Sequence, residues 1–277
     1  MKTILVPIEQ TDTTVSTLET ALLFGRKFDS YIEGFALRLA LTEYVGLDGG
    51  SGTLAETFAR DNLEAEKESR HLFEGFMQNQ GVPRSEAKRS LSYGWLEDAP
   101  TGDRFFGSRG RVFDLSVVGR PGAERAPRMA VLQVALFESG HPVLIAPPSP
   151  VQQIGTNVLI AWNCSTEQAR TTTLAIPILQ QAGRVTVLTV EGGAAVPGPT
   201  GEQLCGYLQS HEILATPLTL PLEGHSTGEV ILACAKTLGC DLLIKGAYTQ
   251  SRLKQMIFGG ATRHILAHAT LPVLMAH

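Results

Sequence analysis

Three apolar landmarks occur twice along the chain in the same order, and this internal repeat limits the folds that the sequence can adopt. The offset between the copies falls from 154 residues at the first landmark to 127 at the second, so the first copy carries about 27 additional residues. We expect these additional residues in the charged segment 53–80, which the sequence predicts to be a helix with a solvated face. The paired segments are Ile4–Glu9 with Val158–Asn163, Phe113–Gly119 with Cys240–Gly246, and His141–Ile145 with Leu271–Met275.

The length of the chain suits two domains of about 140 residues, one for each copy. Hydrophobic residues make up 43% of the 277 residues and charged residues 18%, which is enough apolar material for a core in each half. Between the copies, the segment 146–150 contains three prolines, which disfavour both a helix and a central strand. The sequence therefore predicts domains at 1–147 and 154–277, joined by a short linker.

Within each copy, short runs rich in Val, Ile and Leu alternate with longer helical patterns, which is typical of an α/β fold with an open, mostly parallel sheet. Ser165 and Gln168 form a Ser-x-x-Gln capping box after the first strand of the second copy, and Asp12 is expected to cap the equivalent helix of the first. In such sheets ligands bind at the carboxyl ends of the strands, where the strand order reverses. The strands expected in the second copy lie near 156–162, 184–190, 215–221, 241–246 and 272–276.

Charge and hydropathy exclude several classes of partner. The formal net charge is −4 and no run of Lys or Arg occurs, so we expect no nucleic-acid partner. No segment approaches the roughly 18 apolar residues of a membrane span, and the start lacks a signal-peptide core, which predicts a cytoplasmic protein with no membrane partner. The four cysteines show no C-x-x-C spacing, so reduced thiols are favoured over disulfides or a metal site.

The most informative segment is 246–266, in which Gly246 follows a strand and Gly259-Gly260 precedes a helix. Glycines let backbone N–H groups approach an anion, and a helix N-terminus adds partial positive charge. This segment resembles the C-terminal signature of universal stress proteins, and the whole chain resembles a tandem member with two Rossmann-like, adenine nucleotide alpha hydrolase-like domains. The resemblance implies ATP with Mg as the ligand of the second domain. The implied contacts are Asn163, Gly246, Thr249, Gly259, Gly260 and Ala261.

Departures from the family pattern weaken this implied site. Thr249 stands where the family has its second glycine. Gly260 stands where the family has Ser or Thr, and the missing hydroxyl would lower the affinity for phosphate roughly ten- to a hundredfold. Asn163 replaces the family's ribose-contacting Asp but keeps an amide oxygen and two donors. In the first copy Glu9 is long enough to fill the pocket itself, and Met129-Ala130 replace the Gly-Ser pair. We therefore expect weak or absent nucleotide binding there.

Each of these residues also has a plainer interpretation. The glycines turn the chain and allow helix packing, and Asn163 caps the next turn through its own side chain. His264 and His268 have a spacing that suits a metal, but no partner pattern supports one, so packing or surface roles are favoured. Cys164 at a helix start suggests a thiol nucleophile, but no His-Asp arrangement accompanies it.

The leading hypothesis is a non-enzymatic stress-response regulator whose second domain senses an adenine nucleotide. The resemblance implies that the two copies pair with each other through their last strands, and that a homodimer of chains can form. The second hypothesis is a nucleotide-free scaffold or partner-binding stress protein. The third is an ATP-hydrolysing enzyme, which is disfavoured because no general base lines the glycine loop.

Overall fold

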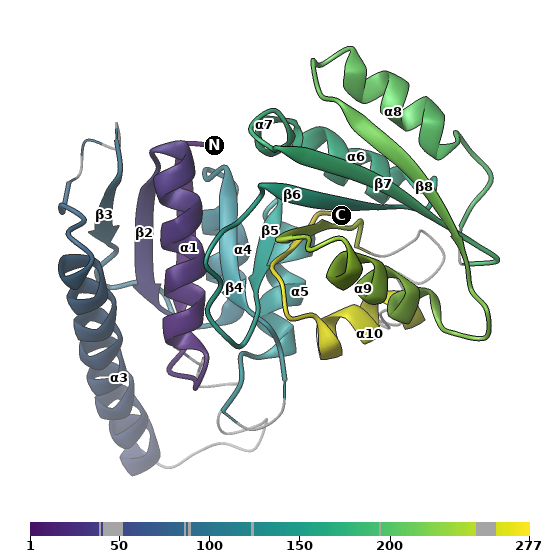
Figure 1. Cartoon of the computed structure of the whole chain (residues 1–277). Helices are drawn as coiled ribbons and strands as arrows, with labels where there is room; N and C mark the ends of the chain where they lie inside the picture. The colour runs from purple at the N-terminus through teal and green to yellow at the C-terminus, as the bar shows by residue number, and fades with distance from the viewer. Residues whose placement is uncertain are drawn as a thin grey trace. The chain divides into compact units, whose positions relative to one another are not determined.

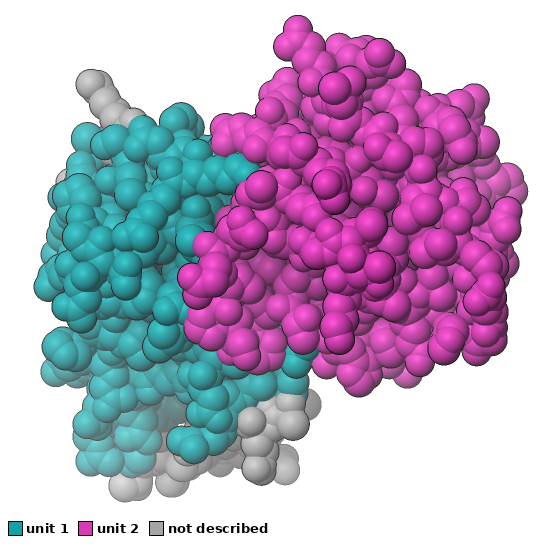
Figure 2. Space-filling view, in the orientation of Figure 1, with its two compact units in different colours: residues 1–141 teal, residues 142–277 magenta. Residues whose placement is uncertain are grey.

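The structure is a computed structural model, drawn as a cartoon in Figure 1. The described residues are 1–38, 40, 52–85, 87, 90–122, 125–193, 195–247 and 259–277. They divide into two compact units, residues 1–141 and 142–277, which Figure 2 shows in different colours. The domain limits predicted from the sequence, 1–147 and 154–277, differ from the limits of these units and stay a prediction.

Unit 1 is built on four parallel strands in the order β3-β2-β1-β4. Helix α1 contacts β1, β2 and β4, α3 contacts β2 and β3, and α4 packs on α5. Nearly every strand residue is buried, as expected for strands covered on both faces. The elements are β1 Thr3–Ile8, α1 Thr14–Phe28, β2 Tyr31–Ala36, α3 Gly52–Asn79, β3 Ser92–Trp95, α4 Asp103–Gly110, β4 Leu115–Gly119 and α5 Met129–Glu138.

Unit 2 contains six strands in the order β5-β10-β9-β6-β7-β8, parallel except for the antiparallel pair β5 and β10. In Figure 1, α6, α7 and α8 lie on one face of these strands and α9 and α10 on the other. The elements are β5 Val143–Ala146, β6 Asn157–Trp162, α6 Thr166–Leu174, α7 Ile176–Leu179, β7 Arg184–Glu191, α8 Gly201–Gln209, β8 Ala215–Pro221, α9 Thr227–Thr237, β9 Leu242–Ile244, α10 Gly260–His268 and β10 Val273–Met275.

The order of the strands in unit 2 reverses between β6 and β9. From β6 the chain runs outward through β7 to β8, and from β9 it runs the other way to β10. The carboxyl ends of β6 and β9 therefore flank the position at which open α/β sheets bind ligands. Helix α6 begins four residues after β6, and α10 is the helix that follows β9.

The α/β fold with a mostly parallel sheet is confirmed, and so are the five strands expected in the second copy. Residues 147–156 form neither helix nor strand, in agreement with the linker, although Ala146 ends β5. The last strands of the two sequence copies, β5 and β10, pair antiparallel within unit 2. No described helix is long and apolar enough to cross a membrane.

One expectation about a helix cap is wrong, and the expectation of a solvated helix over 53–80 is incomplete. Asp12 does not cap α1, because the N-cap is Thr13, which makes no side-chain cap hydrogen bond, while the Asp12 N–H donates to the Arg125 carbonyl. Helix α3 is more than a solvated face, since Phe73 and Met77 in its last turns are fully buried. Phe73 lies so close to Gly34 of β2 that a Cβ there would stand 2.8 Å from the ring. The other described side chains of α3 are exposed or half-buried except Ser69, so the expected solvated face is present beside a buried stripe.

Candidate functional site

The carboxyl end of β6 is shaped by a short turn that leads into α6. Cys164 adopts a left-handed conformation, φ 64°, and Ser165 then caps α6 by accepting the Gln168 N–H at 3.1 Å. The predicted capping box is only half formed, because the Gln168 side chain does not return to Ser165 and bonds Gly246 instead. The N-terminus of α6 is thereby tied to the end of β9.

Asn163 lies at this turn, and part of its side chain is already used. Its Oδ1 accepts the Ser165 N–H at 3.2 Å, and its carbonyl accepts the Val196 N–H at 3.1 Å. The plainer interpretation of Asn163, a cap of the next turn, therefore holds for its oxygen. No described residue accepts a hydrogen bond from its Nδ2, which is left as the donor that a ligand could use.

A segment after β7 folds over the end of β6. Trp162 Nε1 donates to the Pro199 carbonyl at 2.8 Å, and Cys164 Sγ donates to the same oxygen at 3.1 Å. A Cβ on Gly198 would stand 2.8 Å from the Cys164 Cβ, so this approach requires glycine. Burial raises the pKa of the Cys164 thiol, which disfavours the thiolate that a nucleophile would need.

Gly246 directly follows Lys245 at the end of β9 and packs against α6. Its N–H donates to Gln168 Oε1 at 2.6 Å, and a Cβ at this position would stand 2.5 Å from the Gln168 backbone nitrogen. The close approach of strand and helix explains the glycine without any ligand. Because its N–H already has an acceptor, Gly246 acts on the site by positioning α6 and not as a free donor.

Lys245 is a charged group that the sequence reasoning missed. The residue is 9% exposed, and Nζ donates to the Gly246 carbonyl at 3.0 Å. Burial lowers the pKa of Lys245 to about 8, while the nearby Glu167 carboxylate acts in the opposite direction. The one available signal was a lysine that continues the apolar run Leu242–Ile244. A buried ammonium at the carboxyl end of a central strand is suited to interaction with an anion.

Helix α10 begins at the Gly259-Gly260 pair with no side-chain cap. By contrast, α6, α8 and α9 are each capped by a hydroxyl, from Ser165, Thr200 and Ser226. The first N–H groups of a helix have no partner within it, so those of Gly260 and Ala261 can bind an anion. No described atom lies within 4 Å of a Cβ built at Gly259 or Gly260. Thr249 lies outside the described residues.

The equivalent position in unit 1 is filled by the protein's own side chains. The Glu9 carboxylate accepts the backbone N–H of Arg128, the N-cap of α5, at 3.2 Å and its Nε at 3.3 Å. The same guanidinium bonds both oxygens of Asp103, at 2.6 and 3.2 Å. Burial raises the pKa of Glu9 in spite of the neighbouring Arg128. The Glu9 carboxylate thus lies at the N-terminus of α5.

The two histidines of α10 pack on each other. The ring centroids of His264 and His268 are 4.5 Å apart. Among the described residues, no group of three His, Cys, Asp or Glu side chains could hold a metal ion. A Cβ on Gly228 of α9 would stand 2.7 Å from the His264 Cβ, so His264 lies at the contact between α9 and α10. The packing interpretation accounts for these two side chains.

Comparisons with known proteins agree with this architecture. Residues 207–277 match the model of the Universal stress protein family. A universal stress protein from Archaeoglobus fulgidus has a similar structure, with a TM-score of 0.70 and 15% identity over 99% of this chain and 97% of that one. No curated protein matches the chain in sequence.

Two structures from Pseudomonas aeruginosa are also similar over the whole chain. One is assigned to the universal stress proteins, with a TM-score of 0.54 and 14% identity over 100% of this chain and 93% of that one. The other is a protein of unknown function, with a TM-score of 0.55 and 13% identity over 100% and 92%. At such identities the likeness shows the fold. The resemblance to universal stress proteins is therefore confirmed by the family match in unit 2 and by the fold of the chain.

Proposed function

We propose that this chain, which has a universal stress protein fold and a family match in its second unit, is a stress-response regulator that binds an adenine nucleotide without turning it over. The observation that carries the proposal is the buried ammonium of Lys245 at the strand-order reversal of unit 2. Desolvation penalises a buried charge, and an anionic ligand would offset that penalty. The Lys245 ammonium would therefore favour the binding of a phosphate group at this site.

The other donors of the proposed site are backbone groups at the start of α10. Gly260 and Ala261 would offer N–H groups to phosphate oxygens, and Gly259 permits close approach. Asn163 Nδ2 is a candidate donor to the ribose. Magnesium from solution would neutralise part of the triphosphate charge. In this proposal Gly246 and Gln168 fix the position of α6 and do not contact the ligand.

We expect at most weak nucleotide binding in unit 1. A phosphate at the start of α5 would have to displace the Glu9 carboxylate from the Arg128 N–H and guanidinium. Arg128 would also have to give up Asp103, with which it forms two hydrogen bonds. Unit 1 therefore has a structural or partner-binding role in this proposal. A cytoplasmic location and a homodimer stay predictions from the sequence and the resemblance.

A second candidate function is a nucleotide-free, partner-binding stress protein. Two observations favour it: Gln168 already accepts the Gly246 N–H, and Ser165 already bonds the Asn163 oxygen. Both implied contacts are then satisfied without a ligand.

The experiment that separates the two candidates uses a matched pair of variants at the start of α10. Gly260→Pro removes one N–H donor at a position where proline suits the helix, whereas Gly260→Ala keeps the donor. We expect Mg-ATP to raise the melting temperature of the wild type and of Gly260→Ala, with at least tenfold weaker binding by Gly260→Pro. Nucleotide released from freshly purified, denatured protein would support the same conclusion.

If millimolar Mg-ATP leaves the wild-type melting temperature unchanged and no nucleotide is released, the partner-binding function is favoured. Turnover is tested separately by measuring phosphate release over hours. We expect none above the rate of ATP alone, and steady release would favour an ATP-hydrolysing enzyme.

A further inference from the structure

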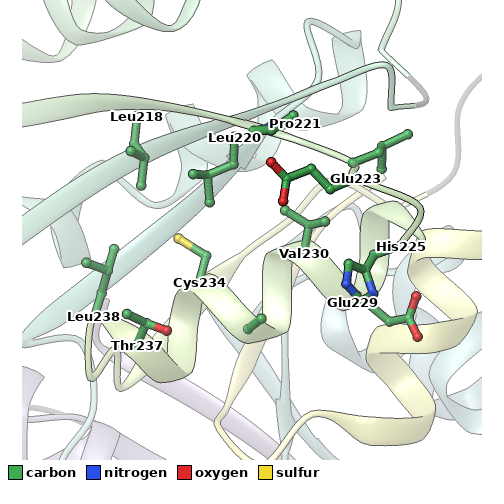
Figure 3. A pocket seen from close by; sticks show the side chains of 12 residues that line it. Leu218, Leu220, Pro221, Glu223, His225, Glu229, Val230, Cys234, Thr237 and Leu238 are labelled. Atoms are coloured by element: carbon green, nitrogen blue, oxygen red, sulfur yellow. The ribbon is translucent and has the colours of Figure 1, made fainter.

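A second concave site lies on unit 2, between the edge strand β8 and helix α9 (Figure 3). We call it the β8–α9 groove; its volume is about 570 Å³, within the range of small-molecule sites. Its lining includes Leu218, Leu220, Glu223, Val230, Ala233 and Cys234.

The groove exists because an apolar stripe on β8 and another on α9 face each other without packing together. Leu218 and Leu220 project from alternate positions of β8 to the same side of the strand, opposite α9 (Figure 3). On α9, Val230 and Cys234 are one turn apart and buried, and they form the floor. Helix α9 contacts the neighbouring strand β7, so the outer face of β8 is only partly covered. The side chains of Leu218 and Leu220 therefore remain half-exposed, so a ligand could contact them.

One end of the groove carries a negative charge with no partner. The tight turn from β8 to α9 is closed by the His225 N–H, which donates to the Leu222 carbonyl at 2.9 Å. Glu223 adopts a left-handed conformation in this turn, φ 48°, and Figure 3 shows its carboxylate pointing into the groove toward Val230. Within the described part of the chain, no hydrogen bond or ion pair engages that carboxylate.

The second carboxylate at this end is already in use. Glu229 accepts the Ser226 N–H at 2.6 Å as part of the α9 capping box, and its side chain points away from the groove in Figure 3. It nevertheless adds negative charge near the opening. The His225 imidazole also lines this end of the groove. An anionic head group would be repelled by Glu223, whereas a cationic head group would find Glu223 as a counter-ion.

We propose that the β8–α9 groove binds a small amphiphilic amine, with an aliphatic or aromatic body along Leu218, Leu220 and Cys234 and a protonated amine at Glu223. Burial of the body against these side chains supplies the affinity, because apolar surface leaves water. Pairing of the ammonium with Glu223 supplies the selectivity. The site shares none of its residues with the nucleotide site proposed above, so either can fail without the other.

Titration calorimetry with octylammonium at low ionic strength, below its micelle concentration, tests the proposal, with octanoate as the probe of opposite charge. We expect one octylammonium per chain and at least tenfold weaker binding of octanoate. Glu223→Gln should remove most of this preference. Glu212→Gln, at another exposed glutamate with a positive φ of 62°, should leave the preference unchanged.

Ala233→Phe places a ring in the groove from an exposed position of α9, where the larger side chain does not disturb the core. We expect it to abolish octylammonium binding, while the exposed control Lys236→Ala binds normally. Absence of binding, equal binding of the two probes, or binding that survives Ala233→Phe would each overturn the proposal. A concentration-dependent dimer that Ala233→Phe dissociates would overturn it too, since a second copy would then cover the groove.

Discussion

Replacement of Lys245 by methionine should stabilise the protein at neutral pH. Burial lowers the Lys245 pKa from 10.5 to about 8, and this difference corresponds to about 3 kcal/mol of unfavourable free energy for the charged folded state. Methionine fills a similar volume without a charge. Loss of the hydrogen bond to the Gly246 carbonyl offsets about 1 kcal/mol, so we expect a net gain of about 2 kcal/mol at pH 7.

The pH dependence of this gain has a definite sign. Between pH 8 and about 10.5 the unfolded state holds a proton on Lys245 that the folded state has lost, so wild-type stability rises with pH in that window. The variant lacks the group and lacks this rise. Its advantage over the wild type should be constant below pH 8 and should shrink by about 1.4 kcal/mol per pH unit above it.

Urea unfolding of both proteins between pH 6 and 10 measures the difference. Lys236→Met, at an exposed lysine of α9, is the control and should show no comparable gain. Because Glu167 loses a neighbouring charge in the variant, Glu167→Gln in both backgrounds separates its contribution. A Lys245→Met protein that is less stable at pH 7, or a difference that does not change with pH, would refute the reasoning.

Other substitutions test single contacts by chemical denaturation. Gly246→Ala should destabilise the protein by about 3 kcal/mol or more, because the new Cβ meets the Gln168 backbone at 2.5 Å. Gly206→Ala, in the interior of α8 with no atom near the new Cβ, should instead stabilise it by up to about 1 kcal/mol. Because the Glu9 pKa is raised in the folded state, the melting temperature of the wild type should fall as pH rises above 4.5. Glu9→Gln should make this fall smaller. Ser226→Ala removes the α9 capping box and should cost about 1 kcal/mol.

The strands β6, β9 and β10 could be predicted from the sequence because each is a short, buried apolar run, whereas the edge strand β8 places Thr and Pro beside its leucines and has no buried residue. Burial on both faces demands such a run, so the signal is local. The same holds for Ser165, whose cap on α6 depends on a residue only three positions away. The departures of the first copy could also be recognised, since Glu9 differs from Asn163 at a matched position of the repeat.

Lys245 and Arg128 could not be predicted in the same way, because their roles depend on distant parts of the chain. A lysine at the end of a strand usually reaches solvent, and only the packing around β9 shows that this one is buried. Arg128 joins Glu9, 119 residues away, to Asp103. The β8–α9 groove was missed because Leu218 and Val230 each fit an ordinary core pattern, and only the structure shows that their two stripes do not close.

The number of nucleotides bound per chain tests the central claim most directly. Equilibrium dialysis against labelled ATP with magnesium, at saturating concentration, counts them without any variant. We predict one ATP per chain, since the start of α10 is uncapped while Glu9 fills the start of α5. A count of two would contradict the assignment of unit 1, and a count of zero would contradict the nucleotide site of unit 2.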